Sequence, residues 1–372
     1  MRMFHFLRYT ILLGLFLPNV EAHKPDWIKS PVIDSERIPF ITAIKMAKKT
    51  LALGSYKLHA EIKPNDELIE ALKEAKARNV EVTIIVEDRL TPEEQKVPQK
   101  SEIKEGDSFK IYQDLGIKVV HGNPKFNAVH EKILMGEGDG SYAIVGNTNF
   151  DKNFQVTDSD DKNVTKVTRD FALFLWDPKI LHELDSVFQS DITQKGIVLK
   201  PYLIQEIPEN EYRLSWGPDQ HYSQLLEMIK SAEKRIDIYQ QALQDEEITH
   251  ALAKASQRGV EIRLLMSKYP FGEKHGNKSE IGQEALKKAG GKVRLTGDTN
   301  KEKVKLHIHA KVMIVDGGLM YLGSANFHTE SLEKSRQVGV ITRDPTHIKP
   351  VQERFLKDWT AEEKETTSLK NE

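Results

Sequence analysis

Two short phrases in the chain each place a histidine and a lysine two residues apart. The first contains His130 and Lys132, and the second contains His309 and Lys311. Side chains two apart on a strand project from the same face, so each pair can be directed at one point. Two such strands brought together would supply two imidazoles and two ammonium groups to one small site. This chemistry suits a phosphodiester, since one imidazole can attack phosphorus while the other protonates the leaving oxygen.

Polar side chains follow each histidine–lysine pair at matching distances. The first copy continues to Asn147 and Asn149, and the second to Ser324 and Asn326. The two later amides, Asn149 and Asn326, can hold charged phosphoryl oxygens together with the lysines. Ser324 can donate a hydrogen bond to a phosphate oxygen, and Asn147 stands at the equivalent position of the first copy. We therefore expect Ser324 and Asn147 to bind substrate.

The second copy reads H-x-K-x4-D-x6-G-S-x-N without a gap, and the first is a degenerate version of it. Together they resemble the paired HKD motifs of the phospholipase D superfamily, and the resemblance covers most of the chain after the first forty residues. It implies that His130 and His309 are the catalytic imidazoles. One would form a phosphohistidine while the other protonates the leaving alcohol, and the roles would then reverse as water or another alcohol attacks. No metal or other cofactor is expected, because lysines and asparagines offset the phosphoryl charge.

The aspartate of the motif is Asp316 in the second copy, where we expect it to stabilise a turn rather than to do chemistry. In the first copy Glu137 lies at the right distance from Lys132, while Asp139 lies at the right distance before Gly146. An insertion of two residues between the strands explains both facts, and Asp139 is assigned the structural role.

The family usually carries an Asn-Arg-Glu-like phrase after each motif, and its carboxylate orients the catalytic histidine. The matching phrases here are Thr168-Arg169-Asp170 and Ser335-Arg336-Gln337. A carboxylate stabilises positive charge on imidazole, so we predict that Asp170 supports His130 as the nucleophile and that His309 is the acid. Gln337 is given a structural role. In the alternative, Asp170 pairs with Arg169 or another neighbour.

Two further groups of residues are candidate ligand sites. His307 and His309 form a His-x-His pair, but no cysteine and no evident third ligand accompany them, so no metal is assigned. Several aromatic residues near motif or loop positions are candidates for an apolar groove that takes acyl chains, although such residues more often belong to a core. They are Trp216, Phe150, Phe154, Phe271 and Phe327.

Charge and composition narrow the class of protein. The 372 residues include 54 Lys and Arg against 56 Asp and Glu, a formal net charge of -2, which gives no general attraction to nucleic acid or to an anionic membrane. There is no cysteine, so disulfides and Cys-ligated metals are excluded. This composition suits a bacterial exported protein that does not rely on disulfides.

The N-terminus has the pattern of a signal peptide over residues 1–22. Arg2 and Arg8 precede or flank a short apolar run over residues 9–18, and Ala22 ends a plausible cleavage site. The run is shorter than the roughly 20 residues of a membrane span, although an uncleaved anchor is the alternative. We expect a secreted or periplasmic protein.

An internal duplication predicts the fold. Residues 69–88 align without gaps on residues 249–268, and the motifs follow at nearly the same offset. Strands alternate with helices in both halves, so we predict an α/β protein. It would have two similar α/β halves, each a mixed sheet flanked by helices, packed with pseudo-two-fold symmetry around one shared active site. The predicted organisation is a first half at 23–193, a linker at 194–215, a second half at 216–360 and a flexible tail at 361–372. Residues 92–107 and 151–168 are predicted to be loops or insertions.

Three functions compete. The first is a phospholipase D-like enzyme that cleaves or exchanges the headgroup of a phospholipid at a membrane surface. The second is a metal-independent exported endonuclease of the same superfamily, which the balanced charge and the two motifs in one chain disfavour. The third is a catalytically weak relative that binds lipid. No obligate protein partner is inferred.

Overall fold

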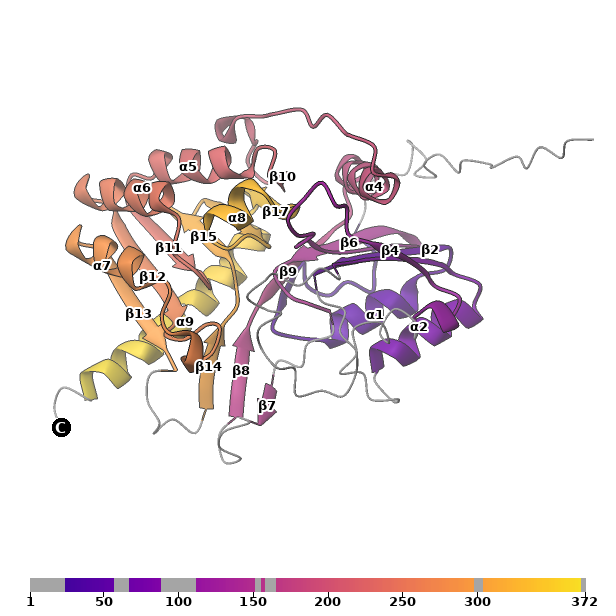
Figure 1. The fold of residues 1–372 in the computed structure, drawn as a ribbon, viewed down its shortest axis with the longest axis horizontal. Coiled ribbons are helices and arrows are strands. Elements are labelled where there is room, and N and C mark those ends of the chain that lie inside the picture. Colours follow the sequence, from indigo (N-terminus) through magenta and orange to yellow (C-terminus); the bar gives the residue numbers. More distant parts are fainter. Residues whose placement is uncertain are drawn as a thin grey trace, which may run out of the picture.

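The computed structural model describes residues 24–56, 67–87, 112–150, 155–157, 165–297 and 304–368. In this part of the chain the predicted duplication is confirmed. Two seven-stranded mixed sheets have the strand orders β1-β9-β6-β5-β2-β3-β4 and β10-β17-β16-β15-β11-β12-β13. The two orders match strand for strand, and Figure 1 shows the sheets side by side with helices on their outer faces.

The elements of the first half are β1 (Val32–Asp34), α1 (Ile38–Met46), β2 (Thr50–Ser55), α2 (Glu67–Ala77), β3 (Glu81–Val86), β4 (Lys118–His121), β5 (Lys132–Gly138), β6 (Gly140–Gly146), β9 (Phe171–Leu175) and α4 (Pro178–Thr193). Those of the second half are β10 (Tyr212–Gly217), α5 (His221–Ser231), β11 (Arg235–Tyr239), α6 (Glu246–Gln257), β12 (Glu261–Ser267), α7 (Glu280–Lys288), β13 (Lys292–Thr296), β15 (Val312–Val315), β16 (Leu319–Gly323), α8 (Thr329–Glu333), β17 (Gln337–Thr342) and α9 (Pro345–Ser368). A third sheet joins β14 (Val304–Ile308), β8 (Thr165–Arg169) and β7 (Gln155–Thr157), and two short 3-10 helices are η2 (Ile204–Glu206) and η3 (Glu273–His275).

The duplicated block keeps its contacts as well as its sequence. Arg78, after α2, donates hydrogen bonds to carbonyls at the end of α1, including that of Ala47 at 3.2 Å. Arg258, after α6, does the same at the end of α5, including the carbonyl of Ala232 at 3.3 Å. A guanidinium at a helix C-terminus satisfies carbonyls that have no partner within the helix. The aligned arginines therefore brace the same helix pair in both halves.

One core joins the two halves. Alternate residues of β5 and β15, such as Ile133 and Ile314, face a cluster to which both sheets contribute. Phe188 of α4 and Phe355 of α9 belong to the same cluster. The intervening residues of each strand face two separate clusters under the outer helices. Because burial on both sides fixes the register of the motif strands, the ends of these strands are held in place.

A strand pair crosses between the halves. β8 of the first half pairs in parallel with β14 of the second, with Arg169 opposite Ile308. Figure 1 shows these two strands side by side between the two sheets. The segment 151–168, predicted to be a loop or an insertion, contains β7 and the start of β8, so it is not a loop throughout.

Other boundaries also differ from the prediction. The linker predicted at 194–215 includes η2 and the first residues of β10, which pairs with β17. The tail predicted from residue 361 is helical through Ser368, because α9 continues that far. The signal peptide and the predicted loop at 92–107 lie outside the described residues. Of the helices in the described ranges, none has the length and hydropathy needed to cross a bilayer.

Candidate active site

Both motif histidines lie where the backbone leaves regular strand structure. His130 comes just before β5, and His309 lies in the break between β14 and β15. The sequence predicts continuous strands over residues 129–135 and 308–315, and this is wrong, because β5 begins at Lys132 and β15 at Val312. At each break the histidine backbone is held by the other half, since the N–H of His130 donates to the carbonyl of Arg336 (2.8 Å) and that of His309 to the carbonyl of Arg169 (3.1 Å).

The imidazole rings are paired across the halves in the same crossed manner. Nδ1 of His309 lies 2.6 Å from Oδ1 of Asp170. Nδ1 of His130 lies 3.0 Å from Oε1 of Gln337. The prediction that Asp170 supports His130 is therefore wrong. The physical reason is the β8–β14 pairing, which carries Asp170 past its own half to the histidine of the second half.

Gln337 is fixed in the orientation that accepts from His130. Its Oε1 accepts a hydrogen bond from Oγ of Ser324 (2.7 Å), and its Nε2 donates to Oγ of Ser331 (2.8 Å). With the amide oxygen toward the ring, Nδ1–H of His130 donates to Gln337 and Nε2 remains available for proton transfer. Gln337 thus fixes the ring of His130, a role beyond the structural one predicted for it.

Both motif lysines are fully buried beside their own histidines. Nζ of Lys132 donates to the backbone carbonyl of His130 at 2.7 Å, and Nζ of Lys311 donates to the carbonyl of His309. Burial lowers the pKa of His130 well below its usual value, and the charges of Lys132, Lys311 and His309 lower it further. Since all three act on His130, the structure brings the two histidine–lysine pairs into one site. Buried cations of this kind suit an anionic ligand.

The two asparagines occupy equivalent places. Asn326 is buried and Asn149 is half-buried. The side-chain carbonyl oxygen of each is buried without a hydrogen-bond partner among the described residues. Buried polar atoms are rarely left unpaired, and when they are, a bound ligand or water commonly explains them. Because these oxygens accept hydrogen bonds, they suit a donor such as water or a protonated leaving oxygen, and the predicted hold on anionic phosphoryl oxygens stays a prediction.

Ser324 and Asn147 each accept a hydrogen bond from the backbone of a neighbouring strand, while Nδ2 of Asn147 is buried without a hydrogen-bond partner among the described residues, so their predicted contact with substrate stays a prediction. Oγ of Ser324 accepts from the N–H of Val338 (3.0 Å), and Oδ1 of Asn147 accepts from the N–H of Phe171 (2.6 Å). Both side chains are fully buried, and each ties the end of one strand to the strand that follows. Asn147 and Ser324 thus make the same kind of strand-to-strand contact in the two halves. Ser324 also donates a hydrogen bond to Gln337.

Asp316 lies at a turn, as its predicted structural role requires. Its carboxylate accepts the backbone N–H groups of Glu233, Lys234 and Arg235 at 2.7–2.9 Å, which ties the β15–β16 turn to the start of β11. In the first half the carbonyl of Glu137 accepts from the N–H groups of Lys48 and Lys49 instead. Asp139 pairs with Nζ of Lys48, at 2.5 Å on the surface.

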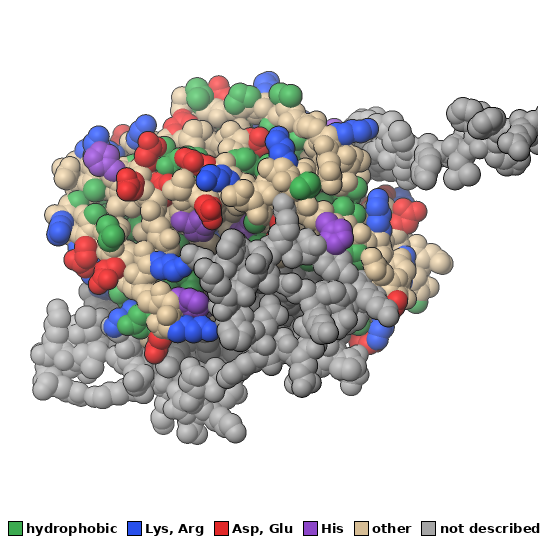
Figure 2. Space-filling model, viewed as in Figure 1, with side chains coloured by type: hydrophobic (Ala, Val, Ile, Leu, Met, Phe, Trp, Pro, Cys, Tyr) green, Lys and Arg blue, Asp and Glu red, His purple; other side chains and the backbone are tan. Residues whose placement is uncertain are grey.

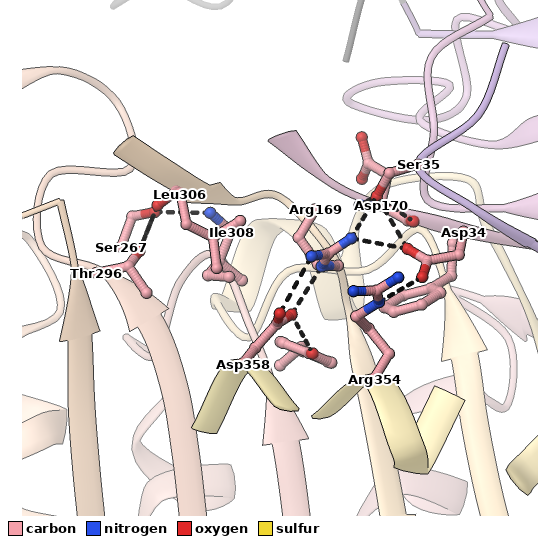
Figure 3. A network of polar contacts seen from close by, with 12 residues as sticks. Asp34, Ser35, Arg169, Asp170, Ser267, Thr296, Leu306, Ile308, Arg354 and Asp358 are labelled. Carbon is pink, nitrogen blue, oxygen red and sulfur yellow. Dashed lines mark hydrogen bonds and ion pairs between the residues drawn. The ribbon is translucent and has the colours of Figure 1, made fainter. Parts of the chain in front are cut away.

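Ion pairs of two buried arginines, which were not predicted from the sequence, support the crossed arrangement. Nε of Arg169 lies 2.7 Å from Asp358 of α9, and Nη1 lies 2.8 Å from Asp34. Figure 3 shows this network, with Arg169 between the two carboxylates. Nε of Arg336 lies 2.9 Å from Asp191 of α4 in the symmetric position. The same offset separates the two arginines and the two aspartates, so a repeat search extended to the last helices would have found them.

Two more residues at the site were not predicted. The ring of Tyr56, just after β2, lies 4.6 Å from that of His130 and 5.4 Å from Nζ of Lys132. Gln241, just after β11, accepts a hydrogen bond from Nζ of Lys311 at 3.0 Å. Both follow the strand that pairs with the motif strand of their half, β2 beside β5 and β11 beside β15, and that position was the available signal in the sequence.

A family model described as cardiolipin synthase, phospholipase D-like domain, matches residues 40–192 and 225–359. The chain belongs to the phospholipase D superfamily. The two matched segments correspond to the two halves of the fold, each with one histidine–lysine pair. The predicted resemblance is confirmed.

Relatives of this superfamily member have low sequence identity. It is 28% identical over 155 residues to the mitochondrial cardiolipin hydrolase of Danio rerio, covering 42% of this chain and 64% of that one. It is 27% identical over 253 residues to the probable cardiolipin synthase YwiE of Bacillus subtilis, covering 63% of this chain and 46% of that one. The chain therefore spans about half to two thirds of the length of these relatives.

The solved phosphatidylserine synthase of Haemophilus influenzae Rd KW20 shares the fold of this phospholipase D-like chain. The TM-score is 0.62 at 11% identity, covering 89% of this chain and 86% of that one. At this identity the likeness concerns the architecture, and it agrees with the two-half α/β fold predicted from the duplication.

The remaining candidates are the aromatic residues considered for an acyl-chain groove and His307, considered as a metal ligand. Trp216, Phe150 and Phe327 are core residues, while Phe271 is 40% exposed. Phe154 lies outside the described residues. Nδ1 of His307 lies 3.5 Å from Oγ of Ser267. Within the described ranges, no group of three or more His, Cys, Asp or Glu side chains is arranged to hold a metal ion.

Proposed function

We propose that this chain is a phospholipase D-type enzyme that cleaves or exchanges the headgroup of a phospholipid. The observation that carries the proposal is the crossed pair of rings, His309 on Asp170 and His130 on Gln337, beside two buried lysines. Family membership and the names of the relatives, a cardiolipin hydrolase and a cardiolipin synthase, support a phospholipid as the substrate.

The asymmetry of the two partners assigns the roles. Phosphorylation makes an imidazole cationic, and a carboxylate on the far nitrogen stabilises that cation better than an amide does. His309, which has the carboxylate of Asp170, is therefore the nucleophile. His130, whose partner is the neutral Gln337, is the acid. This reverses the assignment made from the sequence.

The proposed reaction has two steps. Nε2 of His309 attacks phosphorus, the bond from phosphorus to the leaving oxygen breaks, and His130 gives that oxygen its proton. Water or an alcohol then attacks the phosphohistidine, loses a proton to His130, and releases His309. Lys132 and Lys311 lower the proton affinity of His130 in the free protein, and the charge of a bound phosphodiester offsets this effect.

Assays with purified protein test the proposal. Mixed phospholipids and plasmid DNA are offered separately, and released headgroup, exchanged headgroup and nicked DNA are measured. Turnover of phospholipid alone supports the proposal, and the ratio of hydrolysis to exchange with added alcohol separates the two reactions. Turnover of DNA alone would show that the chain is an endonuclease of this superfamily.

We also propose that the protein is exported after cleavage near Ala22. The basic, short apolar N-terminal segment supports this. Mass spectrometry of protein from the periplasm or medium should show a chain that begins near residue 23. An intact N-terminus on membrane-bound protein would favour an anchor.

Figure 2 shows the distribution of charged side chains on one face of the molecule. Acidic and basic side chains are interspersed over the described surface, and neither sign forms a broad patch on this face. The distribution agrees with the near-balanced composition. Affinity for an anionic substrate is thus attributed to the buried lysines of the site.

A further inference from the structure

Glu131 is a buried acid for which the reaction has no use. It lies between His130 and Lys132, and its side chain is fully buried. Neither of its carboxyl oxygens has a hydrogen-bond partner among the described residues. Burial of an ionised carboxylate without partners is strongly unfavourable, so the location demands an explanation.

The symmetry of the fold shows what Glu131 replaces. Strand register puts Gly54 opposite Ile133 and Tyr239 opposite Val312, which are equivalent motif positions. A Cβ atom on Gly54 would lie 2.7 Å from Oε1 of Glu131. In the second half the residue at the position of Glu131 is Ala310. The carboxyl of the first half therefore fills space that the second half fills with the Tyr239 ring.

The neighbours of the two groups are equivalent as well. The phenol of Tyr239 donates to Oδ2 of Asp358 at 2.6 Å, and Asp358 is the partner of Arg169. Glu131 lies near the corresponding pair of Asp191 and Arg336, since both act electrostatically on its carboxyl. A phenol beside an aspartate is a neutral donor. A carboxyl in the same place matches it only while it keeps its proton.

We propose that Glu131 is a positioning residue for His130 that acts as a neutral carboxylic acid, the first-half counterpart of the Tyr239 phenol. If Glu131 lost its proton, its carboxylate would compete with that of Asp191 for the guanidinium of Arg336. The carbonyl of Arg336 holds the backbone of His130, and the next residue, Gln337, holds its ring. Ionisation would thereby loosen the acid of the reaction, a consequence that rests on the proposed function.

The surroundings of Glu131, above all its burial, favour the neutral form at neutral pH. Burial and then Asp191 raise its pKa to about 8, against smaller opposing effects of Arg336 and Lys132. Asp219 shares Arg336 at 2.9 Å on the side of β10. Gly54 of β2 brings no charge. The unfolded chain releases this proton near pH 4.5, so stability is lost as pH rises from about 4.5 to 8 and no further above that.

Two variants test the proposal. Glu131→Gln is a neutral mimic, and the double exchange Gly54→Tyr with Glu131→Ala rebuilds the arrangement of the second half. The first readout is the thermal midpoint. The midpoint of Glu131→Gln relative to the native chain should rise between pH 5 and pH 8 and then stay constant. A difference independent of pH would overturn the neutral state. Glu131→Gln alone suffices for this test if the double exchange does not fold.

The second readout is the ring resonances of His130 by NMR. In the native chain they should shift across pH 8 as Glu131 ionises, and in Glu131→Gln this shift should be absent. An identical shift in both proteins would overturn the positioning role. Neither readout needs substrate, so both hold if the proposed activity fails.

Turnover of a short-chain phospholipid, whose alcohol leaving group needs a proton from His130, provides a third readout. Scaled to its own rate at pH 7, the native chain should lose about tenfold in rate per pH unit above 8. Glu131→Gln should lack this alkaline limb of the pH–rate profile. A limb of equal size in both proteins would also count against positioning by Glu131. Absence of turnover in the native chain would instead contradict the proposed function.

Discussion

Oδ1 of Asp170, in the first half, lies 2.6 Å from Nδ1 of His309, in the second. The equivalent contact joins Gln337 to His130, so each half supplies the partner for the other half's ring. Removing one half would therefore disable both histidines. The two halves are one catalytic unit, although each carries a complete histidine–lysine pair.

Replacing the carboxylate should slow phosphorylation of the enzyme. Asp170→Asn keeps the shape but removes the charge that stabilises cationic His309, and we expect a loss of about 10² to 10⁴ in the first step. Rapid-quench measurement of the first turnover checks this. The surface variant Asp139→Asn is the control and should retain the native rate to within about twofold. A loss of less than tenfold for Asp170→Asn would show that the carboxylate does not stabilise cationic His309.

The two histidines should fail in different ways. His309→Ala should form no covalent adduct with a p-nitrophenyl phosphodiester, because it lacks the nucleophile. His130→Ala should still form one, since nitrophenolate leaves without a proton. Intact-protein mass after a single exposure distinguishes the two. An adduct on the His309 variant and none on the His130 variant would restore the assignment first made from the sequence.

The ring of His130 should titrate at an unusually low pH. Burial and the nearby cations lower its pKa well below 6.5, so the free protein holds it neutral at pH 7. Gln337→Glu places a carboxylate on Nδ1 and should raise the pKa, because the negative charge favours imidazolium. NMR titration of labelled histidine measures both values. A lower pKa in Gln337→Glu would contradict the contact, and activity should survive this change.

Loss of a buried partner should cost stability. Asp191→Ala removes the main carboxylate of buried Arg336, and we expect a loss of about 3 kcal/mol in the free energy of unfolding. Glu284→Ala, which breaks the exposed pair with Lys287, should cost less than about 1 kcal/mol. Urea denaturation at pH 7 compares them. Equal costs would show that the Arg336 pair is not part of the support.

Turnover should persist in excess chelator. Lys132 and Lys311 supply positive charge within the site, so a divalent ion is not required to stabilise the phosphoryl oxygens. Rates with and without EDTA should agree to within about twofold. Complete loss in EDTA, restored by a divalent ion, would assign that charge to a metal.

The sequence by itself determined the duplication, the fold class and the residues of the two motifs. These depend on local information, since periodicity and residue spacing repeat at a nearly constant offset. Strand boundaries near His130 and His309 were less accurate. There the backbone bonds to Arg336 and Arg169 of the other half, which no local pattern records.

Only the tertiary structure decided which partner each histidine has. Sequence order puts Asp170 in the half of His130, but the parallel pairing of β8 with β14 delivers it to His309. The exchange of Glu131 and Gly54 for Ala310 and Tyr239 is equally invisible in either copy alone. A side chain from one strand there compensates for the volume of a residue on its neighbour, and only packing brings the two together.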